Sequence, residues 1–101
     1  MIIVLTTYSN KKKAQGIAKE IIKQNLAACV NVIKIESSHY KWNGKFCETG
    51  EFLLVIKTAN KNYKRLEKFI KKNHPYKMPE IIQLKVSGGF SAYLDWVDQA
   101  I

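Results

Sequence analysis

Hydrophobic and polar residues follow two different periods along the chain, and together they predict a mixed fold of strands and helices. A near-continuous apolar run at positions 2–7 is typical of a central strand that is buried on both faces. Two later segments, 11–26 and 62–72, repeat their apolar residues at helical spacing and carry lysines on the outer face. The residues expected to face inward are Ala14, Ile17, Ala18, Ile21, Ile22 and Leu26 in the first segment and Tyr63, Leu66, Phe69 and Ile70 in the second.

The stretch 28–58 predicts two long strands joined by a tight turn at Asn43-Gly44. Both residues tolerate positive φ, which a type I′ hairpin turn requires. Counting outward from the turn, position i faces position 87 − i. This register places Trp42 opposite Lys45, His39 opposite Glu48, Ile35 opposite Phe52, Ile33 opposite Leu54 and Val32 opposite Val55.

The same register places Glu36 opposite Glu51, and facing like charges destabilise a ladder. Two interpretations are open. A β-bulge near Ser37-Ser38 or Thr49-Gly50 would separate the carboxylates. Alternatively, the two carboxylates form a pair that binds a cation.

After the second helix, positions 81–86 alternate as a strand, and a last short helix is expected to be capped by Ser91. Its apolar face would consist of Tyr93, Leu94, Trp96, Val97 and Ile101. The order β-α-β-β-α-β plus a terminal helix predicts one α+β domain over residues 1–101, a ferredoxin-like sandwich with a long central hairpin. Right-handed crossovers place both helices on one face of a four-stranded antiparallel sheet.

Both faces of the hairpin base are apolar in this register. One face is expected to carry Ile33, Ile35, Phe52 and Leu54, and the other Val30, Val32, Leu53 and Val55. Because the helices cover only one face, the other must be buried against another subunit. The pattern alone therefore predicts an oligomer.

Composition narrows the cellular setting. The chain has 101 residues, 47% of them hydrophobic, and no apolar run approaches the ~18 residues of a membrane span. The first residues lack the basic start of a secretory signal, so we expect a cytoplasmic protein without a membrane partner. The hairpin register separates Cys29 and Cys47 by roughly 36 Å at ~3.3 Å per residue, which predicts free thiols.

The net charge of +9 is typical of proteins that bind nucleic acid or another polyanion. However, sixteen of the seventeen basic residues are lysine rather than arginine, which binds phosphate bidentately. A solvated lysine-rich surface is therefore the preferred interpretation, and a nucleic-acid partner is not expected.

The residues do not match the motifs of two known functional classes with this topology. The third strand has one aromatic residue, Phe52, and lacks the basic-glycine-aromatic motif of RNA-recognition modules. A phosphatase of the acylphosphatase type needs an arginine at a phosphate loop, but the only arginine is Arg65 on the second helix. No catalytic serine or cysteine arrangement has defensible spacing, so we expect no enzyme.

A few residues could bind a ligand or metal. His74 lies where the second helix ends, and the negative pole of that helix favours a cation there. The alternative is a C-terminal histidine without a ligand. Cys29 is expected to be a small core residue, Cys47 to be more exposed, and His39 with Glu48 to form a surface pair.

Five short motifs in order resemble the CutA family of divalent-cation tolerance proteins over nearly the whole chain. They are Leu26-Ala27-Ala28-Cys29-Val30-Asn31, Tyr40-Lys41-Trp42-Asn43-Gly44-Lys45, Leu54-Val55-Ile56-Lys57-Thr58, His74-Pro75-Tyr76 with Pro79-Glu80-Ile81, and Tyr93-Leu94-Asp95-Trp96. The resemblance implies a ferredoxin-like subunit in a homotrimer, similar in architecture to PII signalling proteins. It also implies a role in tolerance to copper and other divalent metals.

The copper site of a bacterial family member uses a cysteine near the end of the first strand and two histidines before Pro-Tyr. The matching positions here are Thr6, Asn73 and His74, of which only His74 is a copper ligand type. The resemblance therefore implies weak copper binding with His74 as the metal-binding residue. The alternative function is a PII-like signalling module that binds a small anionic ligand between subunits.

Overall fold

The computed structural model describes residues 1–100, so Ile101 of the predicted last helix lies outside the described residues. The elements are β1 (Ile2–Tyr8), α1 (Lys11–Lys23), β2 (Cys29–Trp42), β3 (Lys45–Thr58), the 3₁₀ turn η1 (Asn60–Asn62), α2 (Tyr63–Lys72), β4 (Ile82–Lys85) and α3 (Ser91–Gln99). Among these residues, no helix combines the length and the apolar character needed to cross a membrane.

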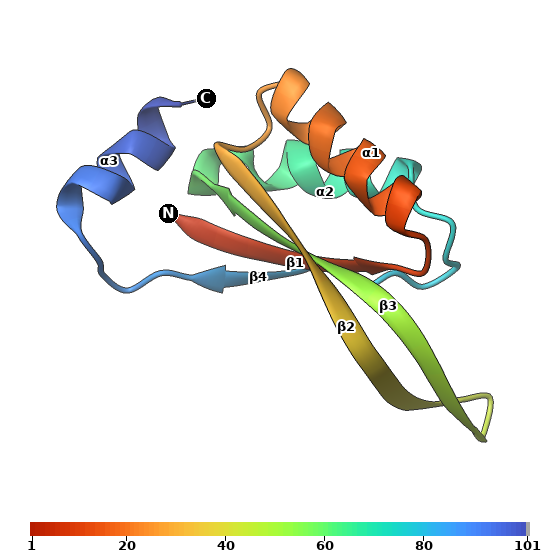
Figure 1. Ribbon diagram of the computed structural model, residues 1–101. Coiled ribbons are helices and arrows are strands. Elements are labelled where there is room, and N and C mark those ends of the chain that lie inside the picture. The colour runs from red at the N-terminus through yellow and green to blue at the C-terminus, as the bar shows by residue number, and fades with distance from the viewer. Residues whose placement is uncertain (101) are drawn as a thin grey trace.

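The four strands form one antiparallel sheet in the order β2-β3-β1-β4. Helices α1 and α2 lie side by side over one face of this sheet, and α3 lies beyond the end that holds the N-terminus (Figure 1). The predicted ferredoxin-like α+β fold is confirmed. Below the helices, the sheet has no second helical layer, and we call its uncovered side the open face.

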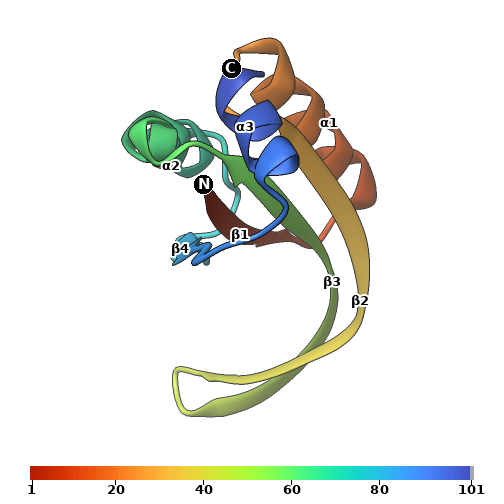
Figure 2. The same ribbon diagram turned by 90° about the vertical axis from the view of Figure 1, so that its left-hand side faces the viewer.

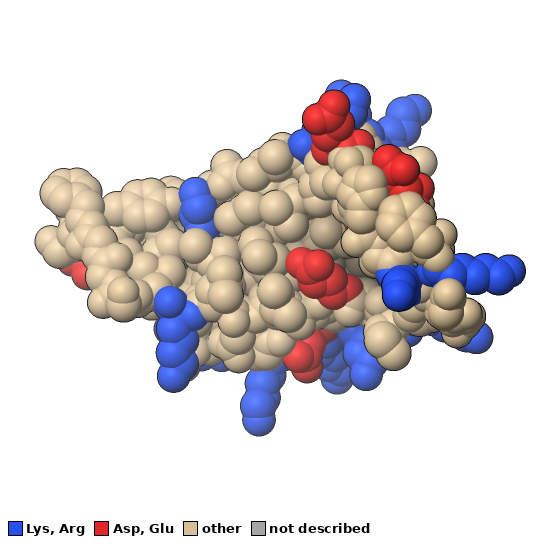
Figure 3. All heavy atoms as spheres, turned by 90° about the horizontal axis from the view of Figure 1, so that it is seen from below, with Lys and Arg blue, Asp and Glu red and all other residues tan. Residues whose placement is uncertain are grey.

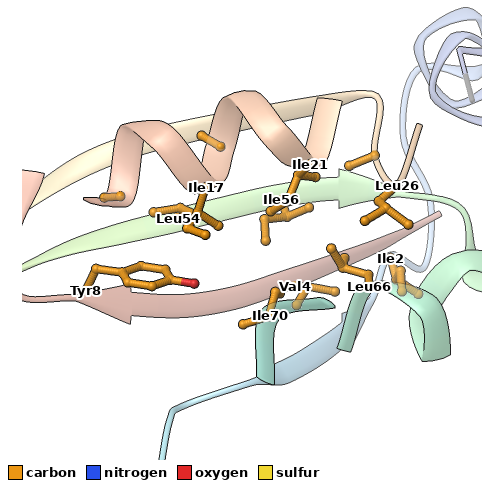
Figure 4. Close-up of a cluster of buried hydrophobic side chains, with 13 residues drawn as sticks. Ile2, Val4, Tyr8, Ile17, Ile21, Leu26, Leu54, Ile56, Leu66 and Ile70 are labelled. Carbon is orange, nitrogen blue, oxygen red and sulfur yellow. The ribbon is translucent and has the colours of Figure 1, made fainter. Parts of the chain in front are cut away.

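The core fills the space between the two helices and the sheet (Figure 4). Its members are less than a tenth exposed, and they include Ile2, Val4, Tyr8, Ala14, Ile17, Ala18, Ile21, Leu26, Leu54, Ile56, Leu66 and Ile70. Ile22 was placed on the inner stripe by its spacing, but it is 41% exposed. Helix α1 ends one residue later, and Asn25 with φ 57° turns Leu26 back into the core.

A side-chain cap is present at the start of α1 but not at the start of α3. The Asn10 side chain accepts a hydrogen bond of 3.0 Å from the Lys13 amide, as an N-cap does. Ser91 does not cap α3, because the N-cap position is Phe90 and no side chain bonds the first turn.

The turn of the long hairpin agrees with its sequence. Asn43 and Gly44 both have positive φ, 54° and 76°, as a type I′ turn requires. From there the predicted register holds as far as Ser38, which pairs with Thr49. The hairpin then bends away from the helices and curls beneath the open face (Figure 2).

A β-bulge between Ile35 and Ser38 changes the register of the hairpin base. Two residues of β2, Glu36 and Ser37, lie between these paired positions, whereas β3 contributes only one. Ile35 therefore faces Glu51, and the predicted pairing of Glu36 with Glu51 is wrong. The interpretation that a bulge separates the two carboxylates is confirmed.

The bulge also corrects the faces of the hairpin base, because a shift of one residue moves every side chain to the other face. Val30 faces Ile56 and Val32 faces Leu54 on the helix side. The open face instead carries Ile3, Leu5, Ile33, Ile35, Leu53, Val55, Ile82 and Leu84. The predicted apolar character of both faces is confirmed, although the membership of each face was wrong.

The turn geometry predicts the effect of a β-branched residue at its second position. Gly44→Val should lower the free energy of unfolding by ~1 kcal/mol or more, because valine strongly disfavours positive φ. Urea denaturation measures the change. Gly88→Val is the matched control, since a Cβ at Gly88 meets nothing within 4 Å and its φ is not in the left-handed region. Equal stability of Gly44→Val and the wild type would contradict a type I′ turn.

Candidate functional site

Three parts of the chain meet at the C-terminal end of β1: the strand itself, the segment between α2 and β4, and the base of the hairpin. His74 connects them. Its Nε2 lies 2.7 Å from the Thr7 carbonyl oxygen, and its Nδ1 lies 3.2 Å from the Tyr76 amide nitrogen. The ring also stacks on Tyr8, with centroids 4.2 Å apart and planes 18° apart.

These contacts determine which nitrogen carries the proton. Nδ1 accepts the hydrogen bond from the Tyr76 amide, so it holds no proton. Nε2 must then carry the proton that it donates to the Thr7 carbonyl. Both ring nitrogens of His74 are therefore occupied in a neutral ring, and neither has a free lone pair directed at solvent.

Burial lowers the pKa of His74 from its ordinary value of 6.5. The Thr7 carbonyl and the Glu51 carboxylate act in the opposite direction, and Lys13 adds to the lowering. Desolvation is the largest of these contributions, so the net shift favours the neutral ring.

The three positions that match the bacterial copper site do not form a ligand set. Thr6 is fully buried on the helix side of β1, and its Oγ1 has no hydrogen-bond partner. The Asn73 side-chain amide donates to the Phe69 carbonyl at 2.9 Å. With both His74 nitrogens also in use, these residues do not fit a three-residue copper site.

The other ligand-type residues are dispersed over the hairpin. Cys29 and Cys47 are free thiols, as predicted. Both are half-buried, so the expectation that Cys29 is a core residue is wrong. His39 is 3.8 Å from the Glu48 carboxylate and 3.0 Å from the Ser37 hydroxyl, so the expected surface pair is present. Nowhere in residues 1–100 do three or more His, Cys, Asp or Glu side chains gather as a metal site requires.

Glu51 has a different partner from the one its register predicted. The Tyr76 hydroxyl donates a hydrogen bond of 2.9 Å to Glu51 Oε2. Burial, together with this bond, raises the pKa of Tyr76. The paired-carboxylate cation site of Glu36 and Glu51 is therefore wrong, and Glu51 instead joins the hairpin to the α2–β4 segment.

A pocket of about 420 Å³ opens beside this contact. Tyr40 and Trp42 of β2 line one wall, and the 76–80 segment, which includes Met78, lines the other. Thr7 and Glu51 also belong to the lining, from neighbouring strands β1 and β3. The volume is within the range of ~300–1,000 Å³ usual for small-molecule sites.

Sequence reasoning identified His74 and missed the pocket. The alternation of Tyr40 and Trp42 beside the turn and the Tyr76 after Pro75 were the available signals. They did not suffice, because the pocket also includes Thr7 of β1 and residues 76–80, which only the folded chain brings beside the hairpin.

Known proteins resemble this chain along almost its whole length. The family model for the CutA1 divalent ion tolerance protein matches residues 2–100. A divalent-cation tolerance protein CutA of Thermus thermophilus is 39% identical over 95 residues, covering 94% of this chain and 92% of that protein. The chain spans about half the length of the curated plant and mammalian relatives that it matches.

Solved structures agree with these matches. The divalent cation tolerance protein (Cut A1) of Thermus thermophilus superposes with a TM-score of 0.93 at 38% identity, covering 99% of this chain and 98% of that one. A PII-like protein CutA from Nostoc gives a TM-score of 0.92 at 29% identity, with 99% and 96% covered.

The His74 contacts predict a loss of stability in mild acid. The pKa of the folded ring lies below 6.5, so the unfolded chain binds the proton first. The contribution of His74 is complete above pH ~6.5 and is lost as the pH falls from there through the lower folded pKa, since protonated Nδ1 no longer accepts from Tyr76.

Urea denaturation between pH 7.5 and pH 5 measures this effect. His74→Phe keeps an aromatic ring beside Tyr8 and should flatten the pH dependence. His39→Phe is the control, because it removes the other histidine, which lies exposed on the hairpin. Equal slopes for the wild type and His74→Phe would show that His74 does not titrate in this range.

Proposed function

Because the chain belongs to the CutA1 divalent ion tolerance family, we propose that it acts in divalent-cation tolerance as a homotrimer that binds copper weakly. The relatives described above are named for cation tolerance and not for a reaction, and the proposed role includes no catalytic step. The observation that carries the proposed homotrimer is the exposed apolar surface on the open face of the sheet.

The open face has the properties of a subunit interface. Ile33, Ile82 and Leu84 are each between 46% and 49% exposed in a single chain. Figure 3 views the molecule from below, and most of the surface there is neither acidic nor basic, with the lysines mainly around the rim. Large exposed apolar patches with a polar rim mark interaction sites, and burying such a patch is favourable by roughly 25 cal/mol per Å².

The shape of the hairpin supports a ring rather than a two-fold dimer. The hairpin projects beyond the helices and bends toward the side of the open face (Figure 2). Contact between the hairpin of one copy and the open face of the next joins two different surfaces of the chain. Head-to-tail contacts form a cyclic ring when the rotation between copies closes, and three copies make the smallest such ring.

The copper proposal rests on the state of His74. The neutral imidazole is the form that binds copper, and the lowered pKa maintains that form. However, the Nδ1 lone pair already accepts from the Tyr76 amide, so a metal must displace that hydrogen bond. Losing a net contribution of ~1 kcal/mol, with no second ligand at Thr6 or Asn73, makes the binding weak.

A second candidate function follows from the likeness to the PII-like protein CutA of Nostoc. In that alternative, the chain is a signalling module that binds a small anionic ligand in a cleft between subunits. A titration with metals and with anionic metabolites separates the two functions.

The first prediction concerns assembly. Light scattering at micromolar concentration should give about three times the chain mass of 11.6 kDa. Ile33→Lys should reduce this mass, because it places a charge on the open face. Ile22→Lys is the matched control, since Ile22 is similarly exposed but belongs to α1. A monomer mass for the wild type would overturn the trimer.

The second prediction concerns copper. Calorimetric titration of the assembled protein should show weak binding, and His74→Ala should reduce it while the light-scattering mass stays unchanged. Tight binding that survives His74→Ala would place the ligands elsewhere. Cys29, Cys47 and His39 would then be the next residues to substitute.

A further inference from the structure

The pocket beside Tyr76 brings together three aromatic rings and two carboxylates. Tyr40 and Trp42 come from β2, and Tyr76 comes from the α2–β4 segment. Glu51 and Glu80 also line the pocket, and Lys77 is the single basic residue among its lining residues. The charges of Glu51, Glu80 and Lys77 therefore sum to one negative charge.

The register of the hairpin turn is the reason that Tyr40 and Trp42 share a face with Glu51, and the β-bulge adds Ile33 and Ile35 to that face. Tyr40 pairs with Cys47 and Trp42 with Lys45, and both partners alternate in phase with Glu51 along β3. Tyr40 and Trp42 therefore lie on the open face with Glu51. Without the extra residue in β2, an unshifted ladder would place them on the opposite face from the one that Ile33 occupies.

The contact between Tyr76 and Glu51 organises this arrangement. The hydroxyl of Tyr76 donates to Glu51 Oε2, which fixes the ring of Tyr76 beside the carboxylate. Only one oxygen of Glu51 is used by this bond, so the carboxylate keeps acceptor capacity for a ligand. His74 lies behind Tyr76, with ring centroids 4.7 Å apart, and holds the start of the segment through the Tyr76 amide.

Aromatic faces and carboxylates recognise the same kind of ligand. The face of an aromatic ring carries negative electrostatic potential and attracts cations, most strongly for tryptophan, and rings that line one site bind ammonium groups with attached methyls. We propose that this pocket binds a small organic cation with a methylated or quaternary ammonium group. The rings contact its methyl groups, and Glu51 and Glu80 balance its charge.

The overall charge of +9 does not prevent this binding. The lysines of α1 and α2 lie on the helix side of the sheet, whereas the pocket includes Thr7 of the open face. At physiological ionic strength the Debye length is about 8 Å, so distant exposed charges are largely screened. The carboxylates of Glu51 and Glu80 therefore favour a cation inside the pocket, and Lys45, which pairs with Trp42 on the same face, is outside the lining.

The same charges disfavour an anionic ligand at this place. An anion would bring its charge close to Glu51 and Glu80, with Lys77 alone to compensate. The expected ligand of the pocket therefore has the opposite sign to that of the PII-like alternative. The organic cation uses neither nitrogen of His74, so it does not compete with copper for the same atoms.

The test uses the assembled wild-type protein and a pair of probes that differ only in charge. Choline carries a quaternary ammonium, and 3,3-dimethylbutan-1-ol replaces that nitrogen with carbon. NMR titration follows the indole N–H signal of Trp42, assigned with Trp42→Phe. We expect saturable binding of choline. The affinity for the neutral alcohol should be lower by a factor of about ten or more.

Variants of the lining residues locate the site. Trp42→Leu, followed by calorimetry, should weaken choline binding about tenfold, whereas Trp42→Phe retains a ring and most of the affinity. Glu80→Gln should weaken it severalfold and needs no change in the hairpin. Phe46→Leu is the control on the other face of the hairpin, in β3, where Phe46 is 69% exposed, and it should leave the affinity within about twofold.

Light scattering of each variant shows whether a change in choline affinity is accompanied by a change in assembly. Choline binding that weakens in Glu80→Gln at unchanged mass supports the proposal. Equal affinity for choline and the neutral alcohol overturns it, because the site would then be merely apolar. Preferential binding of inorganic phosphate, or no binding of choline because a second copy fills the pocket, also overturns it. A wild-type monomer that still binds choline would instead contradict only the trimer.

Discussion

The architecture of the hairpin depends on one extra residue in β2. The strand pair runs from a turn whose register is determined by Asn43 and Gly44 to a base whose register is determined by the core positions of β1 and β3. The two registers differ by one, and the bulge between Ile35 and Ser38 absorbs the difference. It separates Glu36 from Glu51, directs Val32 toward the helices and places Ile33 on the open face with Tyr40 and Trp42.

The two faces of the sheet differ in the residues that they carry, because helices cover only one of them. The helix side holds the core and most of the lysines, while the open face holds Ile33, Ile82, Leu84 and the pocket. The His74 ring connects these layers, since it stacks on Tyr8 of the core and bonds the backbone beside the pocket. Assembly and ligand binding therefore both depend on the surface that the helices leave uncovered.

The sequence predicted the features that depend on local periodicity and turn chemistry. The stripe of Ala14, Ile17 and Ile21 indicated a helix, and Asn43-Gly44 indicated the hairpin turn, because these signals lie within a few neighbouring residues. The faces of the hairpin base were wrong, since a bulge of one residue leaves almost no local signal. It was noticed only through the repulsion that an unbroken register would impose on two glutamates.

The candidate site was less predictable for a similar reason. The sequence shows that a histidine lies at position 74. Its contacts with Thr7 and Tyr8 could not be predicted, because Thr7 lies 67 positions earlier in the chain and Tyr8 follows it. Whether a histidine has a free lone pair depends on such distant partners and not on its neighbours in sequence. The pocket combines β1, β2, β3 and the α2–β4 segment, and only the folded register brings them together.

Cross-strand NOEs of the isotope-labelled protein test the central claim, the one-residue register change, most directly. The structure predicts NOEs that pair Ser38 with Thr49 on one side of the bulge and Ile35 with Glu51 on the other. An unbroken ladder, with Glu36 facing Glu51 and Ile35 facing Phe52, would contradict it. In that case Ile33 and Ile35 would lie on the helix side of the sheet and not on the open face.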